Sequence, residues 1–137
     1  MSTVQTLGDR DYEALARFRH GLRVFLRFSE EAARGAGMTP NQHQLLLAIR
    51  GFAGEGRPTI GDMAEALQLQ HHSVVELVDR AVEAGLVRRH VDRVDRRRQR
   101  LELTAAGRRK LAALTTVHRD ELRRFQVELR ELQRILD

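Results

Sequence analysis

The sequence predicts a mainly α-helical protein with one small β hairpin, and three observations support this fold class. Apolar residues recur every three or four positions over most of the chain, which is the spacing of amphipathic helices. Only residues 86–104 depart from that spacing, with two short strand-like runs on either side of a polar turn. The 137 residues include 42% apolar and 31% charged side chains, so we expect one folded domain over residues 1–137.

The first helix is predicted over residues 7–34. Its apolar side chains, from Tyr12 to Leu26, are spaced by three and four residues. Gly35 and Gly37 then interrupt the pattern, so we expect the helix to end there.

A second helix is predicted to begin after Thr39. Pro40 suits its first turn, and Gln42 stands three residues after Thr39, as in a capping box. Residues 45–52 are apolar nearly all round the helix, so we expect it to be buried. A loop with three glycines and one proline, residues 51–58, follows it.

Residues 59–85 predict two short helices joined by a tight turn. Apolar residues mark one helix at 60–67 and a second at 74–81, and Gly85 is placed to end the second. Two short helices with a tight turn between them form a helix-turn-helix.

The next segment predicts a β hairpin. Residues 86–91 and 99–104 have the pattern of strands, and the polar residues 92–98 form the turn between them. A hairpin directly after a helix-turn-helix is the arrangement of a winged helix, so we expect this architecture.

The last helix is predicted over residues 105–136, with Thr104 as its cap and Gly107 as a weak point in its first turns. Its apolar stripe and that of the first helix together exceed what one small winged helix needs to cover. These two helices can pack against each other within one chain or against a second copy. We expect the second arrangement, a homodimer held by dimerisation helices at residues 7–34 and 105–136.

The net charge of the chain is +5, and all but one of its 24 basic residues are arginine. A GC-rich genome explains a high arginine content, whereas the planar guanidinium group also suits phosphate binding. Placement separates the two explanations, because residues 37–85 carry a net charge of −3 and residues 86–107 carry +4. A basic hairpin beside a helix-turn-helix indicates a nucleic-acid partner.

Residues 59–107 resemble the winged helix of the MarR family of bacterial transcriptional regulators. The residues that match its wing signature are Asp95, Arg97, Leu103, Thr104 and Gly107. The end of the second short helix, Leu77-Val78-Asp79-Arg80 followed by Gly85-Leu86-Val87, is similar as well. The resemblance implies a DNA-binding part over residues 38–107. It also implies a ligand-responsive repressor that binds a pseudo-palindromic duplex as a homodimer.

The first turns of a recognition helix enter the major groove, so side chains there are candidates for base contacts. These candidates are Gln70, His71, His72, Ser73, Val75 and Glu76. A glutamine can pair with adenine and a valine can contact the methyl group of thymine, whereas the two histidines can also be a solvated helix start. Glu76 can accept from cytosine or lie outside the interface. By the resemblance, Arg80 is expected to hold a phosphate.

The turn of the hairpin carries the arginines that we expect to contact the minor groove. They are Arg93, Arg96, Arg97 and Arg98, and the alternative is a solvated run of charge. Asp92 and Asp95 are expected to orient guanidinium groups and to shape the turn, so at least one arginine is structural. By the resemblance, Arg97 divides its role between pairing with an aspartate and touching DNA.

The resemblance also implies a small aromatic or anionic effector, bound between the dimerisation helices and the winged helix. The candidate residues for this site are Arg17, His20, His43 and Arg50. A lone histidine on an otherwise apolar helix is more often a packed core residue, and that alternative stays open.

The sequence holds none of the residue patterns that enzyme chemistry requires. It has no cysteine, and its six histidines lack metal-ligand spacing, so we expect neither a metal site nor a cofactor. Nucleophile, phosphate-loop and dinucleotide motifs are absent, so we expect no enzyme. No apolar run is long enough to span a membrane, and the expected location is the cytoplasm. Two alternatives to a regulator stay open: an architectural DNA-binding protein, and a dimeric protein-interaction module without ligand control.

Overall fold

The computed structural model describes residues 6–137 and contains five helices and one two-stranded antiparallel sheet within that range. The helices are α1 (Asp9–Gly35), α2 (Pro40–Arg50), α3 (Ile60–Leu67), α4 (His71–Glu83) and α5 (Ala105–Leu136), and the strands are β1 (Val87–Val91) and β2 (Gln99–Leu103). The predicted fold class, mainly helical with a small β wing, is confirmed. The first helix begins at Asp9 instead of residue 7, because Gly8 adopts the extended conformation of an N-cap.

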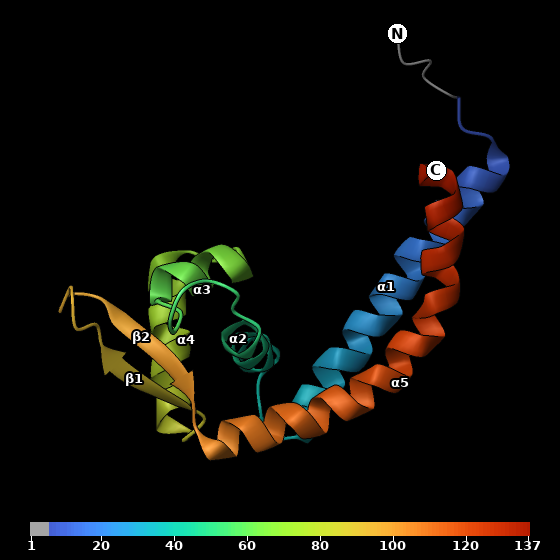
Figure 1. Cartoon of the computed structure of the whole chain (residues 1–137). Coiled ribbons are helices and arrows are strands. Elements are labelled where there is room, and N and C mark those ends of the chain that lie inside the picture. The colour runs from blue at the N-terminus through green and yellow to red at the C-terminus, as the bar shows by residue number, and fades with distance from the viewer. Residues whose placement is uncertain (1–5) are drawn as a thin grey trace, which may run out of the picture.

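The molecule has two parts, which Figure 1 shows at opposite sides of the view. Helices α2, α3 and α4 and the hairpin form one part, which we call the head. Helix α1 and the later part of α5 lie side by side and form an elongated second part, the stalk, with the start of α1 and the end of α5 at its far end, whereas the first turns of α5 lie against the head. Since α5 follows β2 after one residue, the stalk is joined directly to the hairpin.

Threonines begin three of the helices, and the sequence indicates two of these caps, Thr39 and Thr104. The hydroxyl group of Thr39 accepts from the backbone N–H of Gln42 at 3.1 Å, and the side chain of Gln42 accepts from the N–H of Thr39 at 3.0 Å. Thr59 makes the same reciprocal pair with Asp62 at the start of α3. The hydroxyl of Thr104 accepts from the N–H of Gly107 at 3.1 Å, which caps α5.

The turn between α3 and α4 depends on one residue in a left-handed conformation. Gln68 has φ of 53°, and the N–H of Leu69 donates to the carbonyl of Ala64 at 3.1 Å. This bond satisfies one of the last carbonyl groups of α3, and the left-handed residue reverses the chain within a few residues. The turn therefore fixes the angle at which α4 leaves α3.

The core lies in the head, between α4 and the elements around it. Its fully buried large side chains are Leu45, Leu46, Met63, Val74, Val78 and Leu101, which come from α2, α3, α4 and β2. The prediction that the second helix is buried is thus correct for the face that carries Leu45 and Leu46. Because four elements contribute to one core, the hairpin and α4 are held as one unit.

Gly107, predicted to be a weak point of the last helix, lies within the continuous α5 and is closely packed there. A Cβ atom at this position would overlap the carbonyl oxygen of Leu86, so the first turn of α5 touches the backbone between α4 and β1. The same carbonyl accepts from the N–H of Thr104 at 3.0 Å. Glycine is required here by a close approach of two backbone segments, which helix propensity does not describe.

Candidate nucleic-acid interface

The hairpin pairs Val87 with Leu103 at its root and Val91 with Gln99 near its tip. Val87, Leu101 and Leu103 are buried in the head, so the root of the hairpin is part of the core. The N–H of Asp92 donates to the carbonyl of Arg98 at 3.0 Å, which closes the turn beyond the core. The tip of the wing, residues 92–98, therefore projects from a rigid base.

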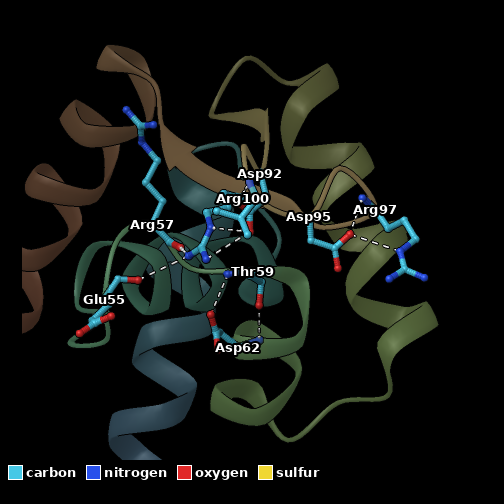
Figure 2. A network of polar contacts seen from close by, with 9 residues as sticks. Glu55, Arg57, Thr59, Asp62, Asp92, Asp95, Arg97 and Arg100 are labelled. Carbon is cyan, nitrogen blue, oxygen red and sulfur yellow. Dashed lines mark hydrogen bonds and ion pairs between the residues drawn. The ribbon is translucent and has the colours of Figure 1, made fainter.

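Two aspartates shape this turn through backbone hydrogen bonds. The Oδ1 atom of Asp92 accepts from the N–H of Val94 at 3.0 Å, and the Oδ1 atom of Asp95 accepts from the N–H of Arg97 at 3.0 Å. The hydrogen bond from the N–H of Val94 is the main reason why the pKa of the Asp92 carboxyl lies below its usual range; desolvation opposes this shift, and the nearby charge of Arg100 adds to it. Asp95 also accepts from Nε of Arg97 at 3.2 Å. Figure 2 shows Asp92 beside Arg100 and Asp95 beside Arg97.

Arg100, which the sequence analysis did not single out, ties the wing to the loop before α3. Its Nε lies 3.4 Å from Oδ2 of Asp92, and its Nη1 donates to the carbonyls of Arg57 at 2.5 Å and Glu55 at 3.4 Å (Figure 2). The hairpin register places residue 100 close to Asp92, which is a signal the sequence does contain. The carbonyl partners lie 43 and 45 residues earlier and leave no local signal.

The arginines of the wing tip point their charge into solvent. Arg93, Arg96 and Arg98 are exposed, and in residues 6–137 no carboxylate lies within ion-pair distance of them. Arg97 is 91% exposed at its side chain even though it pairs with Asp95. The tip therefore presents four guanidinium groups on a turn whose backbone is held by hydrogen bonds.

Helix α4 turns a buried face to the core and a polar face to solvent. Val74, Val78 and Ala81 are buried, together with Leu77. The exposed residues of the helix are His71, His72, Glu76, Asp79, Arg80 and Glu83. This face contains three acids and one arginine, so the positive charge of the region belongs to the wing.

The candidates for base contacts fall into three groups around α4. His71 and Val75 line a cavity of about 520 Å³ between α4 and the wing, which Arg97 and Arg98 also line. Ser73, Glu76 and Arg80 line a second cavity of about 390 Å³, against the start of α2 at Thr39–Gln42. His72 and Gln70 are exposed, and Gln70 is the N-cap residue of α4 without a capping side-chain bond.

An ion pair joins the exposed face of α4 to the hairpin. The guanidinium group of Arg89 in β1 pairs with the carboxylate of Asp79 in α4. Asp79 belongs to the segment that closes the second short helix in the sequence analysis, where no partner is evident. The pair fixes the orientation of the hairpin relative to α4, and it neutralises one of the three acids on that face.

The four residues expected to form an effector site lie in different places. Arg17 pairs with Glu131 of α5 at 3.0 Å, and His20 lines a cavity of about 290 Å³ with Phe25 and Phe125. His43 is 4% exposed and lies against His118, and Arg50 lines a small cavity of about 180 Å³ beside the loop before α3. The four therefore share no common cavity among those found in residues 6–137.

Burial and the neighbouring imidazole of His118 lower the pKa of His43. The carboxyl of Glu102 in β2 has a lowered pKa for a different reason, chiefly its hydrogen bond with His90 at 2.6 Å. In the described part of the chain, no helix is long and apolar enough to cross a membrane, and no three potential metal ligands cluster together.

Comparison with known proteins finds a matching family model and several solved structures of similar fold. Residues 36–98 match the model of the MarR family. The chain is 26% identical, with a TM-score of 0.68, to a MepR mutant of S. aureus bound to an oligodeoxyribonucleotide, and the match covers 82% of this chain and 80% of that one. No curated protein sequence matches the chain.

Two further solved structures share the fold. The first is AbsC, a MarR family transcriptional regulator from Streptomyces coelicolor, with 24% identity, a TM-score of 0.71 and coverage of 92% of this chain and 84% of that one. The second is a mutant of E. coli MarR complexed with operator DNA, with 22% identity, a TM-score of 0.72 and coverage of 89% and 90%.

Proposed function

Residues 36–98 match the MarR family, and from this premise we propose that the chain is a transcription regulator of that family, which binds duplex DNA sequence-specifically as a homodimer. In this proposal α4 enters the major groove and the wing lies against the neighbouring minor groove. The protein acts as a repressor in the cytoplasm and releases DNA when a small aromatic or anionic effector binds.

The observation that carries the proposal is the wing tip. Four guanidinium groups project from a turn that Asp92 and Asp95 hold by backbone hydrogen bonds. A narrow minor groove has a strong negative potential, which attracts arginine side chains inserted into it. A turn that is fixed before binding loses little conformational entropy when it docks.

The charge of α4 favours a sequence-specific regulator over an architectural protein. A protein that binds DNA without sequence preference relies on phosphate contacts, so it needs cations along its whole interface. The exposed face of α4 instead carries Glu76, Asp79 and Glu83. Apart from Arg80, such a face gains little from phosphates, so most of its binding energy must come from base edges.

The stalk supports the homodimer. Helices α1 and α5 pack on each other within the chain, as the intramolecular alternative requires, and still leave large apolar side chains exposed. On α5 these include Leu122, Leu129 and Leu136, which are spaced by seven residues and therefore share one face of the helix. A second copy of the stalk would remove this stripe from water.

Selection of bound sequences from a random duplex pool tests the proposal. We expect a pseudo-palindromic site whose binding resists competitor DNA. Binding to every sequence alike would favour the architectural protein, and no binding at low salt would leave the protein-interaction module. A ligand screen for release of the selected duplex then tests the effector.

Substitution of one wing arginine tests the placement of the wing. Arg96→Gln removes one cation from each protomer, so the slope of log affinity against log salt should fall by about 0.9 for each protomer of the bound dimer. Arg119→Gln, an exposed position on α5, is the control and should leave the slope unchanged. An unchanged slope for Arg96→Gln would remove the wing from the interface.

A further inference from the structure

The exposed face of α4 carries three carboxylates in different situations. Asp79 is paired with Arg89 of β1. Glu83 is the last residue of α4, at the end of the helix that lies away from its first turns. Glu76 is exposed, and in residues 6–137 no basic side chain lies within ion-pair distance of it.

Glu76 also has the position of a groove-facing residue. It lies two positions after the fully buried Val74, so its side chain leaves the opposite side of the helix. It lies one turn after His72, within the first two turns of α4, which are the turns that contact base edges in a docked recognition helix. The cavity that it lines with Ser73 and Arg80 gives the carboxylate room to move.

The chemistry of an ionised carboxylate restricts which base it can face. It offers only hydrogen-bond acceptors, and the phosphates on both sides of the groove repel its charge. Guanine presents the acceptors N7 and O6, and thymine presents the acceptor O4, so both add further repulsion. Adenine combines a donor with an adjacent acceptor, whereas the N4 amino group of cytosine is a donor alone.

We propose that Glu76 is a specificity-determining residue that selects cytosine at one position of each half-site. The inference rests on the proposed function, because it needs α4 in the major groove. Its carboxylate accepts from the N4 amino group of that cytosine and excludes guanine and thymine from the same position. The remaining base contacts then fall to neighbouring side chains of α4.

Sequence selection with two matched variants tests this proposal. Glu76→Gln keeps the size of the side chain and removes its charge, and glutamine pairs with adenine through N6 and N7. We expect one cytosine in each half-site to be replaced by adenine in the selected sequences, with the other positions retained. At that position the native protein should prefer cytosine over guanine or thymine by roughly 5- to 150-fold, and Glu76→Gln should lose this preference for cytosine. Glu83→Gln makes the same change three residues beyond Arg80 and should select the native sequence.

Three results bear against the proposal in different ways. If Glu76→Gln selects the same cytosine, or binds every sequence more tightly by one common factor, Glu76 acts only as a repulsive charge. If both variants shift the same position, the effect comes from the net charge of α4. If the native protein itself selects no sequence, the proposed function fails together with this inference. Far-ultraviolet circular dichroism of each variant checks that the helix is intact.

Discussion

The imidazole rings of His43 and His118 lie 4.9 Å apart, centroid to centroid, where α1, α2 and α5 meet. His118 donates from Nδ1 to the carbonyl of Leu114 at 2.7 Å, and the hydroxyl of Ser29 lies 2.8 Å from its Nε2. A carbonyl can only accept, so the hydroxyl donates to Nε2 when the ring is neutral. The pair joins the head to the stalk through side chains that are buried.

Acidification should therefore destabilise the protein through this pair. The pKa of His43 lies below the ordinary value of 6.5 in the folded chain, so the unfolded chain takes up a proton first as the pH falls. The stabilisation is fully present above about pH 6.5 and is lost progressively below it. Phe25 and Phe28 flank His118, and no carboxylate pairs with either ring in residues 6–137, so nothing there offsets the charge.

Urea unfolding at pH 7.5 and pH 5.5 measures this effect. The urea midpoint of the native protein should be lower at pH 5.5 than at pH 7.5, and His43→Gln should show a smaller decrease in its midpoint. Equal pH dependence in the two proteins would place the titrating group elsewhere.

Removal of the Arg100 side chain should loosen the wing without unfolding the head. Arg100→Met keeps an unbranched side chain but loses the bonds to Asp92 and to the carbonyls of Glu55 and Arg57. We expect a loss of about 1–2 kcal/mol in unfolding free energy, since the bonds are charge-assisted but partly solvated. Hydrogen exchange should accelerate in residues 92–98, and DNA affinity should fall. Unchanged exchange there would show that the turn bonds alone hold the wing.

Two glycine substitutions should have opposite signs. Gly107→Ala places a Cβ against the carbonyl of Leu86, so it should destabilise the protein by about 1–3 kcal/mol despite alanine's better helix propensity. Gly61→Ala in α3 meets only the hydroxyl of Thr59 at 3.7 Å, and it should stabilise by up to about 1 kcal/mol. Thermal unfolding of both variants measures the difference, and a gain for Gly107→Ala would disprove the close approach.

A charge in the exposed leucine stripe of α5 should separate the proposed dimer. Leu129 is 43% exposed, so Leu129→Glu should leave the monomer folded and convert a dimer into a monomer. Ala113→Glu adds the same charge at an exposed position on the opposite side of the same helix and is the control. Light scattering coupled to size-exclusion chromatography measures the mass. A native protein that is already monomeric would contradict the dimer outright.

The sequence predicts those features whose signals are local. Thr39 and Gln42 are three residues apart, and Gly85 follows the C-cap residue of α4, so short motifs predict the helix boundaries there. The wing turn is recoverable for the same reason, because its aspartates bond residues two positions away.

Features that depend on distant backbone are not recoverable in this way. Arg100 meets carbonyl groups more than forty residues away, and Gly107 is fixed by the carbonyl of Leu86. Helix propensity assigns Gly107 a cost, whereas the packing of α5 on the head makes it necessary. The ion pair of Asp79 with Arg89 cannot be predicted for a related reason, since charge patterns along a chain do not specify partners across elements.

The unbroken run of α5 makes it a lever. Its 32 residues extend about 48 Å along the helix, and Thr104 alone separates its start from β2. Figure 1 shows that α5 curves, so its straight reach is shorter than this length, and a swing of about 5° displaces the wing by at most about 4 Å, which is comparable to the rise of about 3.4 Å between neighbouring base pairs. In a homodimer, the crossing angle of two stalks would thus be converted into the distance between two wings, and a change of a few degrees would move them out of step with the double helix.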